Sequence, residues 1–385
     1  MNLLYFSKKF FLVLKNFFSV IVINIKIIYF KFKNKKIIFF YDPEKRYTQS
    51  INYIEDLFNN FGKEFLIFFG SNSTNISGHK NYYIKYSFLK WIYKVDIFIS
   101  NNVCDIFTNN SIKIYLHHDI YDSPLIDLKK KKELFQRLAK YDFLFLSNKK
   151  NTIMFNNFFD KYNFNSNVNI PKIMETGYLK LDYLRRNIKV HNSINNNIVI
   201  APTIHKHVKK LSIFDDLKKI IEILLTNTAS KIIFRPHPID RKTHLTLEIE
   251  ESFKNNNNFK LDISNDYFDT YLNSMCLITD ISGTAYTYAF LTNKPVIFFS
   301  KNEKLINELG HGNLSYFEDR NKIGVIIKNS NEIIKIINNI KSLEKKIKIS
   351  NSNLLKEMNY LGNSKNRIKE IINEILIKKK NHEKI

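Results

Sequence analysis

From Lys36 onward, short apolar runs alternate with segments of helical periodicity, and this alternation constrains the fold more than any other feature. "KIIFFYDP" begins the series, and "EFLIFFGS", "DIFISN", "IKIYLHHD" and "DFLFLSN" continue it. Helix-period segments such as "TQSINYIEDLFNNFG", "YYIKYSFLKWIYKV" and "LKKKKELFQRLAKY" lie between them. Continuous apolar runs of this length are typical of parallel strands that helices bury on both faces. The pattern therefore predicts a parallel sheet covered by helices.

A second cycle of the same kind begins with "NNIVIAPT", after a segment, "FNSNVNIPKIMETGYLKLDYLRRN", that reads as a connector. It continues through "KIIFRPHP", "FKLDIS", "MCLITDISG" and "KPVIFFS" to a last strand near 323–327, and residues 331–378 are expected to be largely helical. We therefore predict two doubly wound α/β domains, at 36–170 and 171–345, followed by a helical tail at 346–385. Paired domains of this kind bind ligands in the cleft between them, at the carboxyl ends of their strands.

The first 35 residues form a separate basic segment, in which apolar and aromatic side chains alternate with lysines and no acidic residue occurs. Lys15 and Lys26 interrupt its apolar stretch, whereas a spanning helix needs about 20 apolar residues. A small-residue cleavage site, which a signal peptide would need, is also missing. We expect 1–35 to be a basic amphipathic helix on an anionic membrane surface, at the cytoplasmic face of the cell membrane. The alternative is an ordinary first helix and strand with solvated lysines.

The net charge of +24 would usually suggest nucleic acid, an anionic membrane or a polyanionic substrate. Only eight of the 60 basic residues are Arg, however, and the chain has no zinc-finger spacing, aromatic RNA-binding signature or basic zipper. We therefore expect no nucleic-acid partner. Two cysteines far apart in apolar stretches, Cys104 and Cys276, fit buried thiols in a reducing compartment.

Two adjacent histidines follow the predicted strand at 112–116. A histidine at a strand end can act as a general base, since it titrates near pH 6.5, and the next carboxylate could orient it. Neighbouring residues of a strand point to opposite faces, so we expect only one of His117 and His118 to face the cleft, with Asp119 supporting it. A pair of metal ligands is not expected. The alternative is that both rings cap the strand and bond the next turn.

Two further motifs end strands of the second cycle. In "RPHP", Arg235 and His237 offer donors suited to phosphate, and two prolines fix the backbone around them. In "TDISGT", Asp280 precedes Ser282, Gly283 and Thr284 at a predicted helix start, where free backbone N–H groups and the helix dipole attract anions. The alternatives are a rigid strand exit and a plain N-cap. Neither a Walker sequence nor a GxGxxG fingerprint occurs in the chain.

Four stretches together resemble the CDP-glycerol glycerophosphotransferase family, the teichoic-acid-type polymerases and primases. They are "TGYLKLDYL" (176–184), "APT" (201–203), "RPHP" (235–238) and "TDISGTAYTYAFLTNKPVIFF" (279–299). The resemblance implies a GT-B-like pair of Rossmann-like domains that is monotopic at the cytoplasmic membrane face. It also implies that His237, Ser282, Gly283 and Thr284 contact the phosphates of the donor. Arg235 and Asp280 would assist, and Asp182 and Thr203 would support the site.

The sequence departs from this family at two points. The family's candidate base lies in a W-H-G-T-like element, where this chain has "YLHHDIYDSP", and Gly283 replaces the second serine of the usual pair. Which of His117 and His118 is the base therefore stays open, and the departure at Gly283 leaves a donor with an alcohol part other than glycerol as an alternative.

The reaction that the resemblance implies is the attack of an acceptor hydroxyl on the β-phosphorus of a CDP-alcohol, with CMP leaving. The donor would be CDP-glycerol or a related CDP-polyol, and the acceptor a lipid-linked molecule or a surface glycan. No metal and no cofactor are expected, because the chain shows no carboxylate cluster with metal-binding spacing. The rival enzyme is a GT-B nucleotide-sugar glycosyltransferase. A rival of another class is a non-catalytic basic protein that binds membranes or nucleic acid.

Overall fold

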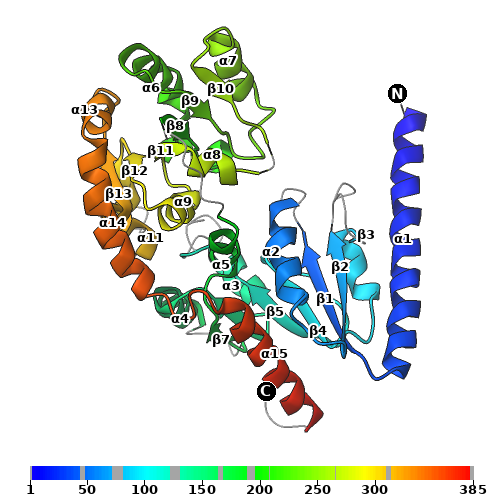
Figure 1. The fold of residues 1–385 in the computed structure, drawn as a ribbon. Helices are drawn as coiled ribbons and strands as arrows, with labels where there is room; N and C mark the ends of the chain where they lie inside the picture. Colours follow the sequence, from blue (N-terminus) through cyan, green and yellow to red (C-terminus); the bar gives the residue numbers. More distant parts are fainter. Residues whose placement is uncertain are drawn as a thin grey trace.

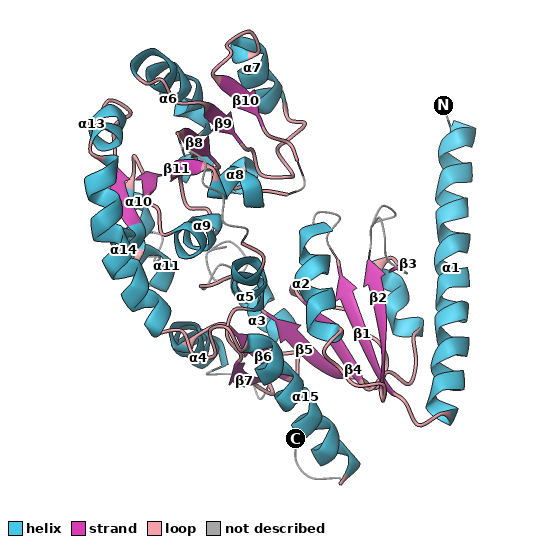
Figure 2. Cartoon of the chain, viewed as in Figure 1, coloured by secondary structure: helices cyan, strands magenta, loops and turns pink. Residues whose placement is uncertain are grey.

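The structure is a computed structural model, and it describes residues 2–43, 48–71, 81–121, 131–163, 168–188, 196–207, 209–264, 266–308 and 314–381. Two groups of parallel strands, each flanked by helices, make up two units of the chain (Figure 2). The predicted fold class, two doubly wound α/β units with C-terminal helices, is confirmed.

The first unit contains a seven-stranded sheet with the order β3-β2-β1-β4-β5-β6-β7. All of its pairings are parallel, as expected for strands that are buried on both faces. The strands are β1 (Lys36–Asp42), β2 (Phe65–Ser71), β3 (Asn81–Tyr83), β4 (Ile97–Ser100), β5 (Ile112–Leu116), β6 (Phe143–Leu146) and β7 (Lys172–Glu175). The helices of this unit are α2 (Thr48–Phe58), η1 (Tyr86–Trp91), α3 (Lys131–Leu138), α4 (Lys149–Asn163) and α5 (Leu179–Arg186).

Two predictions fail in this unit. The segment "YYIKYSFLKWIYKV", expected to be helical, contains the edge strand β3 and the 3-10 helix η1. The supposed connector contains β7, which pairs with β6 and so lies in the first sheet, beyond residue 170 where we placed the domain boundary.

The second unit contains a six-stranded parallel sheet with the order β10-β9-β8-β11-β12-β13. Its strands are β8 (Asn197–Ile200), β9 (Ile232–Phe234), β10 (Phe259–Leu261), β11 (Ser274–Thr279), β12 (Val296–Phe299) and β13 (Gly324–Ile327). The helices around it are η3 (His205–His207), η4 (Lys209–Leu211), α6 (Phe214–Asn227), α7 (His244–Phe253), α8 (Phe268–Leu272), α9 (Thr284–Thr292), α10 (Glu303–Glu308), α11 (Ser315–Glu318), α12 (Arg320–Ile323) and α13 (Glu332–Asn338). Each predicted strand of this cycle is present.

The C-terminal helices tie the two units together. Helix α14 (Ile340–Lys356) runs along the second unit, and α15 (Ser364–Lys380) returns to the first (Figure 1). Apolar side chains of α15, including Ile368 and Ile372, share a core cluster with Ile54 and Leu57 of α2. The tail is therefore part of the packed fold and not a separate appendage.

An aromatic core also joins the units directly. Ile120, Tyr121 and Tyr178 of the first unit belong to the same buried cluster as Tyr286 of the second. The rings of Tyr121 and Tyr286 meet edge to face at 4.4 Å between centroids. Burial of several large side chains at this junction fixes the two sheets relative to each other.

Helix α1 (Asn2–Phe32) is one continuous helix along the outer edge of the first sheet, beside β3 (Figure 1). Lys15 and Lys26 do not interrupt it. They turn back toward the body of the protein, over the rings of Tyr83 and Tyr82 respectively. The stretch Phe10–Phe32 is by length and composition able to cross a membrane, contrary to our prediction that it is too short and too interrupted.

Candidate active site

The loops that carry the predicted site residues begin at the carboxyl ends of β5, β8, β9 and β11. In the second sheet, β8 pairs with both β9 and β11, so the residues after these three strands share one edge. The loop after β5 reaches them from the first unit, because Ile120 and Tyr121 pack in the joint core cluster. The candidate site is thus at the junction of the two units, as the strand-end rule predicts.

His117 is buried beneath this junction. Its Nδ1 atom accepts a hydrogen bond of 3.1 Å from the side-chain amide of Asn151. Its ring packs against the rings of Tyr115 and Phe155. Burial lowers the pKa of His117 to about 3, although the charge of Asp119 opposes this. The Nε2 atom has no hydrogen-bond partner among the described residues. His117 is consequently a neutral core residue at physiological pH.

His118 faces the opposite way, as the alternation along a strand predicts. Its Nδ1 lies 2.7 Å from the carbonyl oxygen of Asn101 and donates to it, so that Nε2 carries the lone pair in the neutral ring. The side chain is 25% exposed, and Nε2 is 3.6 Å from Asp119 Oδ2. Tyr178 fixes the backbone here, because its hydroxyl donates to the His118 carbonyl at 3.0 Å. The His118 ring is therefore oriented by the backbone and partly accessible.

The carboxylate of Asp119 lies against the start of α9. A side-chain carbon on Gly283 would be 3.4 Å from Asp119 Oδ1, and the three atoms nearest to it would all belong to that carboxylate. Gly283 is the N-cap of α9 and provides no side-chain cap. The first unit thus brings His118 and Asp119 to the helix N-terminus that the "TDISGT" motif predicts.

The other residues of this turn are held by aromatic hydroxyls. The Tyr316 hydroxyl donates to the Ser282 carbonyl at 3.1 Å, and the Thr284 and Tyr271 hydroxyls are 2.7 Å apart. Ser282 is mostly buried, with 8% of its surface exposed. Contacts with protein groups thus hold both Ser282 and Thr284 of this turn.

Asp280 lies behind the turn and not on its surface. It is fully buried and accepts the backbone N–H groups of Thr203 and Ile281 on Oδ1 and of Ile213 on Oδ2. Burial raises the pKa of Asp280 to about 6, while these hydrogen bonds lower it. Asp280 therefore holds the loop after β8, the start of α6 and the α9 turn in place.

Arg235 is also directed inward. Its guanidinium donates to Asp262 Oδ2 at 2.6 Å and to the hydroxyl and the carbonyl oxygen of Ser264 at 3.0 and 2.9 Å. The same guanidinium lies 5.8 Å from the ring centroid of Tyr267. The Tyr267 hydroxyl is buried and has no hydrogen-bond partner among the described residues. The Arg235 guanidinium is thus mostly buried and bonded to the segment that follows β10.

His237 is half-buried at the end of β9. Its Nδ1 accepts the N–H of Ile239 at 3.3 Å, which leaves the ring proton on Nε2. An N–H donor of this kind suits a phosphate oxygen.

Asp182, on α5, bonds the C-terminal tail and none of the loops described above. It accepts the N–H groups of Gly362 and Ser364 and the Ser364 hydroxyl, and so anchors the start of α15. Its role is to attach the C-terminal tail.

The structure therefore brings His118, Asp119, Ser282, Gly283 and Thr284 together, while Thr203 and Asp280 support them from behind. The residues that sequence reasoning missed are the tyrosines around them, Tyr178, Tyr267, Tyr271 and Tyr316, and Asn101. They come from separate segments, and no local motif marks them. Among the described residues, no group of three His, Cys, Asp or Glu side chains could hold a metal ion.

Two parallel α/β units, with a histidine of the first beside a helix N-terminus of the second, define a protein of GT-B-like architecture. The model of the family described as CDP-Glycerol:Poly(glycerophosphate) glycerophosphotransferase matches residues 21–374. The chain therefore belongs to this transferase family. A comparison with curated proteins finds no match.

The solved structures that resemble this chain share its fold at low identity. The wall teichoic acid polymerase TagF is 18% identical, with a TM-score of 0.61 over 97% of this chain and 98% of its own. A histidine-to-asparagine variant of TagF soaked with CDPG is 17% identical, with the same TM-score and coverage of 97% and 99%. MnaA of S. aureus with UDP is 13% identical, with a TM-score of 0.60 and coverage of 89% and 97%.

Proposed function

We propose that this protein transfers glycerol phosphate, or a related polyol phosphate, from a CDP-linked donor to a hydroxyl of a lipid-linked or glycan acceptor. The observation that carries the proposal is the contact of Asp119 with Gly283 at the N-terminus of α9, with His118 Nε2 3.6 Å from Asp119. The arrangement supports the proposal because phosphate transfer to a hydroxyl requires a base beside an anion site.

His118 acts as the base in this proposal, and His117 does not. The acceptor hydroxyl gives its proton to His118 Nε2 while its oxygen attacks the β-phosphorus of the donor. The bond from that phosphorus to the bridging oxygen breaks, and CMP leaves with the bridging oxygen. His117 is excluded as the base because it is buried and its pKa is lowered to about 3.

The negative charge that moves onto the leaving phosphate is stabilised by the second unit. The N–H groups at the start of α9, the Ser282 hydroxyl and the Nε2–H of His237 are the donors that we assign to the diphosphate. Arg235 and Asp280 support these groups from behind, since both are committed to protein partners. No cofactor and no bound metal are part of the proposal.

Helix α1 associates with the membrane by lying flat on it. One side of the helix is fixed to the first unit: Val20, Ile23 and Ile27 are buried, and Asn24 bonds the backbone of Trp91 and Tyr93. Crossing a bilayer would expose these polar contacts to lipid, which is costly. The opposite side exposes Phe10, Phe11, Leu14, Phe17, Phe18, Ile21, Ile25, Ile28 and Phe32. An exposed apolar stripe of this size suits a membrane surface, which in this proposal is the cytoplasmic face.

The membrane assignment is tested by flotation with vesicles of phosphatidylglycerol and of phosphatidylcholine. We expect the full chain to float, and Phe11→Ser/Phe18→Ser to lose most of its binding because both rings are exposed. A double variant that floats as well as the wild type would contradict the assignment.

Turnover is tested by incubating the protein and a lipid-linked acceptor with CDP-glycerol, CDP-ribitol and UDP-sugars in turn. We expect CMP release from a CDP-polyol. UDP release from a UDP-sugar would instead support the nucleotide-sugar glycosyltransferase. We retain this alternative because one of the structures that share the fold was solved with UDP.

A further inference from the structure

The segment that follows η1 presents two aromatic rings to solvent. Trp91 and Tyr93 are 52% and 45% exposed, whereas Ile92 between them is buried in the core of the first unit. Ile92 has extended backbone angles, with φ of −95° and ψ of 121°. Because successive side chains of an extended segment point to opposite sides, Trp91 and Tyr93 share the side that faces away from the core.

Hydrogen bonds fix this segment to helix α1. The side-chain amide of Asn24 donates to the Trp91 carbonyl oxygen at 2.8 Å, and its oxygen accepts the N–H of Tyr93 at 3.1 Å. Ile21 and Ile28, three residues before and four residues after Asn24, are its neighbours on the helix surface, and both are exposed. The segment of Trp91 and Tyr93 therefore adjoins the exposed apolar stripe of α1.

The surroundings of the two rings are basic. Lys90 and Lys94 flank them in sequence, and both lysines are exposed. The Nζ atom of Lys90 lies 5.7 Å from the centroid of the Trp91 ring. No acidic residue occurs in the first 35 residues, which supply the adjoining stripe. Exposed Trp and Tyr rings beside lysines are typical of protein surfaces that lie at the level of lipid headgroups.

We propose that Trp91 and Tyr93 form a second contact with an anionic lipid bilayer, beside the stripe of α1. The rings lie among the headgroups, and Lys90 and Lys94 attract the anionic lipids. This inference rests on the membrane association in the proposed function and adds an orientation to it. A helix that lies flat leaves the body of the protein free to rotate about the helix axis, and a contact at its side removes that freedom. The bilayer then faces the outer edge of the first unit, where α1 lies (Figure 1).

The charge of this surface favours a bilayer over a second copy of the chain. Two copies that met through it would bring lysines of like charge together, which is unfavourable. An anionic bilayer offers the opposite charge at its surface and an apolar interior below it, so it complements both the lysines and the apolar stripe.

Trp91 is the single tryptophan of the chain, so its fluorescence reports on this contact alone. The full-length protein is excited where tyrosine does not absorb, and vesicles of phosphatidylglycerol or of phosphatidylcholine are added. We expect phosphatidylglycerol to shift the emission to shorter wavelength, and phosphatidylcholine to shift it much less. Lipids brominated near the headgroup should quench more than lipids brominated near the chain end, because the ring lies at the interface.

Three results of this experiment would overturn the inference. They are an emission that phosphatidylglycerol leaves unchanged, stronger quenching from the chain ends, and an equal shift when the protein is concentrated without lipid. The last result would mean that a second copy covers the ring.

Variants of the aromatic pair test the same contact by flotation. Trp91→Ser/Tyr93→Ser should bind phosphatidylglycerol vesicles about tenfold more weakly than the wild type, with an unchanged melting temperature because both rings are exposed. Leu247→Ser is the matched control, since Leu247 is also 52% exposed but lies on α7 of the second unit. A double variant that binds like the wild type, or a control that loses as much, would contradict the proposed contact.

The lysines are tested by the preference for anionic lipid. Lys90→Gln/Lys94→Gln should reduce binding to phosphatidylglycerol and leave the weak binding to phosphatidylcholine unchanged. Lys231→Gln/Lys260→Gln removes the same charge from exposed positions of the second unit and should change neither. Equal effects of the two double variants would show that only the net charge of the protein matters, against a local role of Lys90 and Lys94.

This inference and the proposed function fail in different ways. A shift of Trp91 emission on vesicles, without turnover of any CDP-polyol, would overturn the proposed transfer and leave the membrane contact intact. Flotation that depends on Phe11 and Phe18, with Trp91 emission unchanged, would keep the assignment of α1 and overturn the second contact.

Discussion

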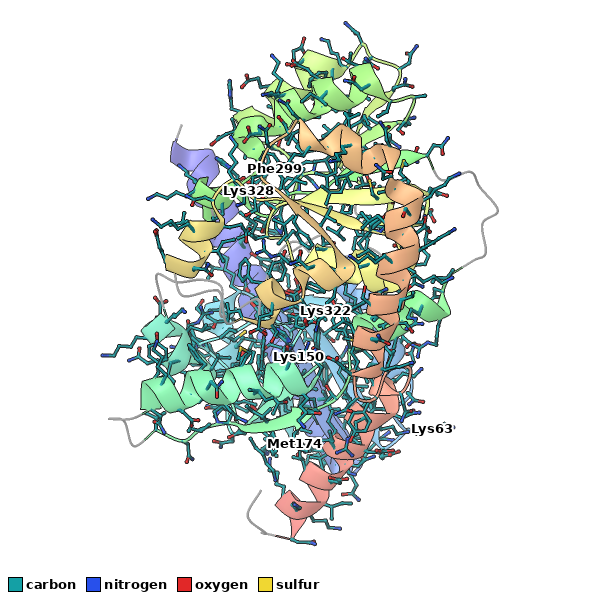
Figure 3. All side chains as sticks on the ribbon, turned by 90° about the vertical axis from the view of Figure 1, so that its left-hand side faces the viewer. Lys63, Lys150, Met174, Phe299, Lys322 and Lys328 are labelled. Carbon is teal, nitrogen blue, oxygen red and sulfur yellow. The ribbon has the colours of Figure 1, made fainter. Side chains whose placement is uncertain are left out.

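The Tyr121 hydroxyl of the first unit donates a hydrogen bond of 2.7 Å to the buried carboxylate of Asp319 in the second. Lys150 and Lys322, both labelled in Figure 3, bond the same carboxylate at 2.6 and 2.8 Å. Tyr121 is two residues beyond Asp119, so this contact anchors the loop that carries the proposed base to the second unit. A change at this junction should therefore also alter the position of the loop that carries His118 and Asp119.

Asp319→Asn should destabilise the protein and reduce turnover together. Burial opposes ionisation of Asp319, but the bonds from Lys150, Lys322 and Tyr121 outweigh it and lower its pKa. Because Lys150 and Lys322 are partly exposed, the loss should be smaller than the value of about 3–5 kcal/mol for a fully buried pair. Because the folded pKa is lowered, the stability is present above about pH 4 and is lost as the pH falls through the lowered value.

Urea unfolding of the wild type and Asp319→Asn at pH 7 and at pH 3 measures this directly. The difference between the two proteins should be larger at pH 7 than at pH 3, with Asp160→Asn, which replaces an exposed carboxylate of α4, as the control. A difference that is equal at both pH values would show that the charge of Asp319 is not what stabilises the junction.

The two adjacent histidines should respond differently to alanine. His118→Ala should lower turnover by about 10²–10⁴-fold, the usual contribution of a general base, and leave the melting temperature nearly unchanged. His117→Ala should lower the stability instead, because it leaves a cavity between Tyr115 and Phe155. Steady-state kinetics and thermal unfolding of both variants measure this contrast. Normal turnover in His118→Ala would refute the assignment of the base.

Arg235→Ala should behave as a folding defect. It would leave the buried Asp262 without its cation, at a cost of about 3–5 kcal/mol, and it would release Tyr267. Replacing Arg235 and Asp262 together should reduce the free energy of unfolding by much less than the sum of the two single losses. A double-mutant cycle with Arg235→Met and Asp262→Leu, followed by urea unfolding, measures this difference. Strictly additive losses would show that the pair is not coupled, and wild-type stability with a raised KM would favour direct phosphate contact by Arg235.

The contribution of Asp280 to the free energy of unfolding should decrease as the pH rises from about 4 to about 6. Burial raises its folded pKa to about 6, so its favourable contribution is present below its usual pKa and is lost as the pH rises through 6. A change of about two pKa units corresponds to roughly 3 kcal/mol. Urea unfolding of Asp280→Asn at pH 4.5 and at pH 7 should show a smaller pH dependence than the wild type. An identical pH dependence would mean that Asp280 does not titrate in this range.

Most strands could be predicted from the sequence because helices bury them on both faces, which produces continuous apolar runs such as "KIIFF". The two missed strands, β3 and β7, are the edges of the first sheet, and β7 is only partly buried. An edge strand lacks the apolar run, so its pattern resembles a helix or a connector. Lys15 and Lys26 led to the wrong prediction that the apolar stretch of α1 is interrupted. Their ammonium groups instead lie over the rings of Tyr83 and Tyr82.

For the candidate site, the sequence predicted which strand ends lie near one another but not which side chains face the junction of the two units. Asp280 and Arg235 stand at strand ends next to turn residues, yet both point into the protein, toward Thr203 and Asp262. The orientation depends on partners that are distant in sequence. The contact of Asp119 with Gly283 joins two units, and no spacing in a single sequence encodes it.

The central claim is that His118 and the α9 N-terminus together transfer a phospho-alcohol from CDP. Its most direct test is single-turnover CMP release from CDP-glycerol or CDP-ribitol, with a lipid-linked acceptor, by the wild type and His118→Ala, beside calorimetric CDP binding by both. We predict CMP release by the wild type, a loss of about 10²–10⁴-fold in the variant, and CDP affinities within a few-fold of each other. No CMP release from either donor, or equal rates in the two proteins, would contradict the account.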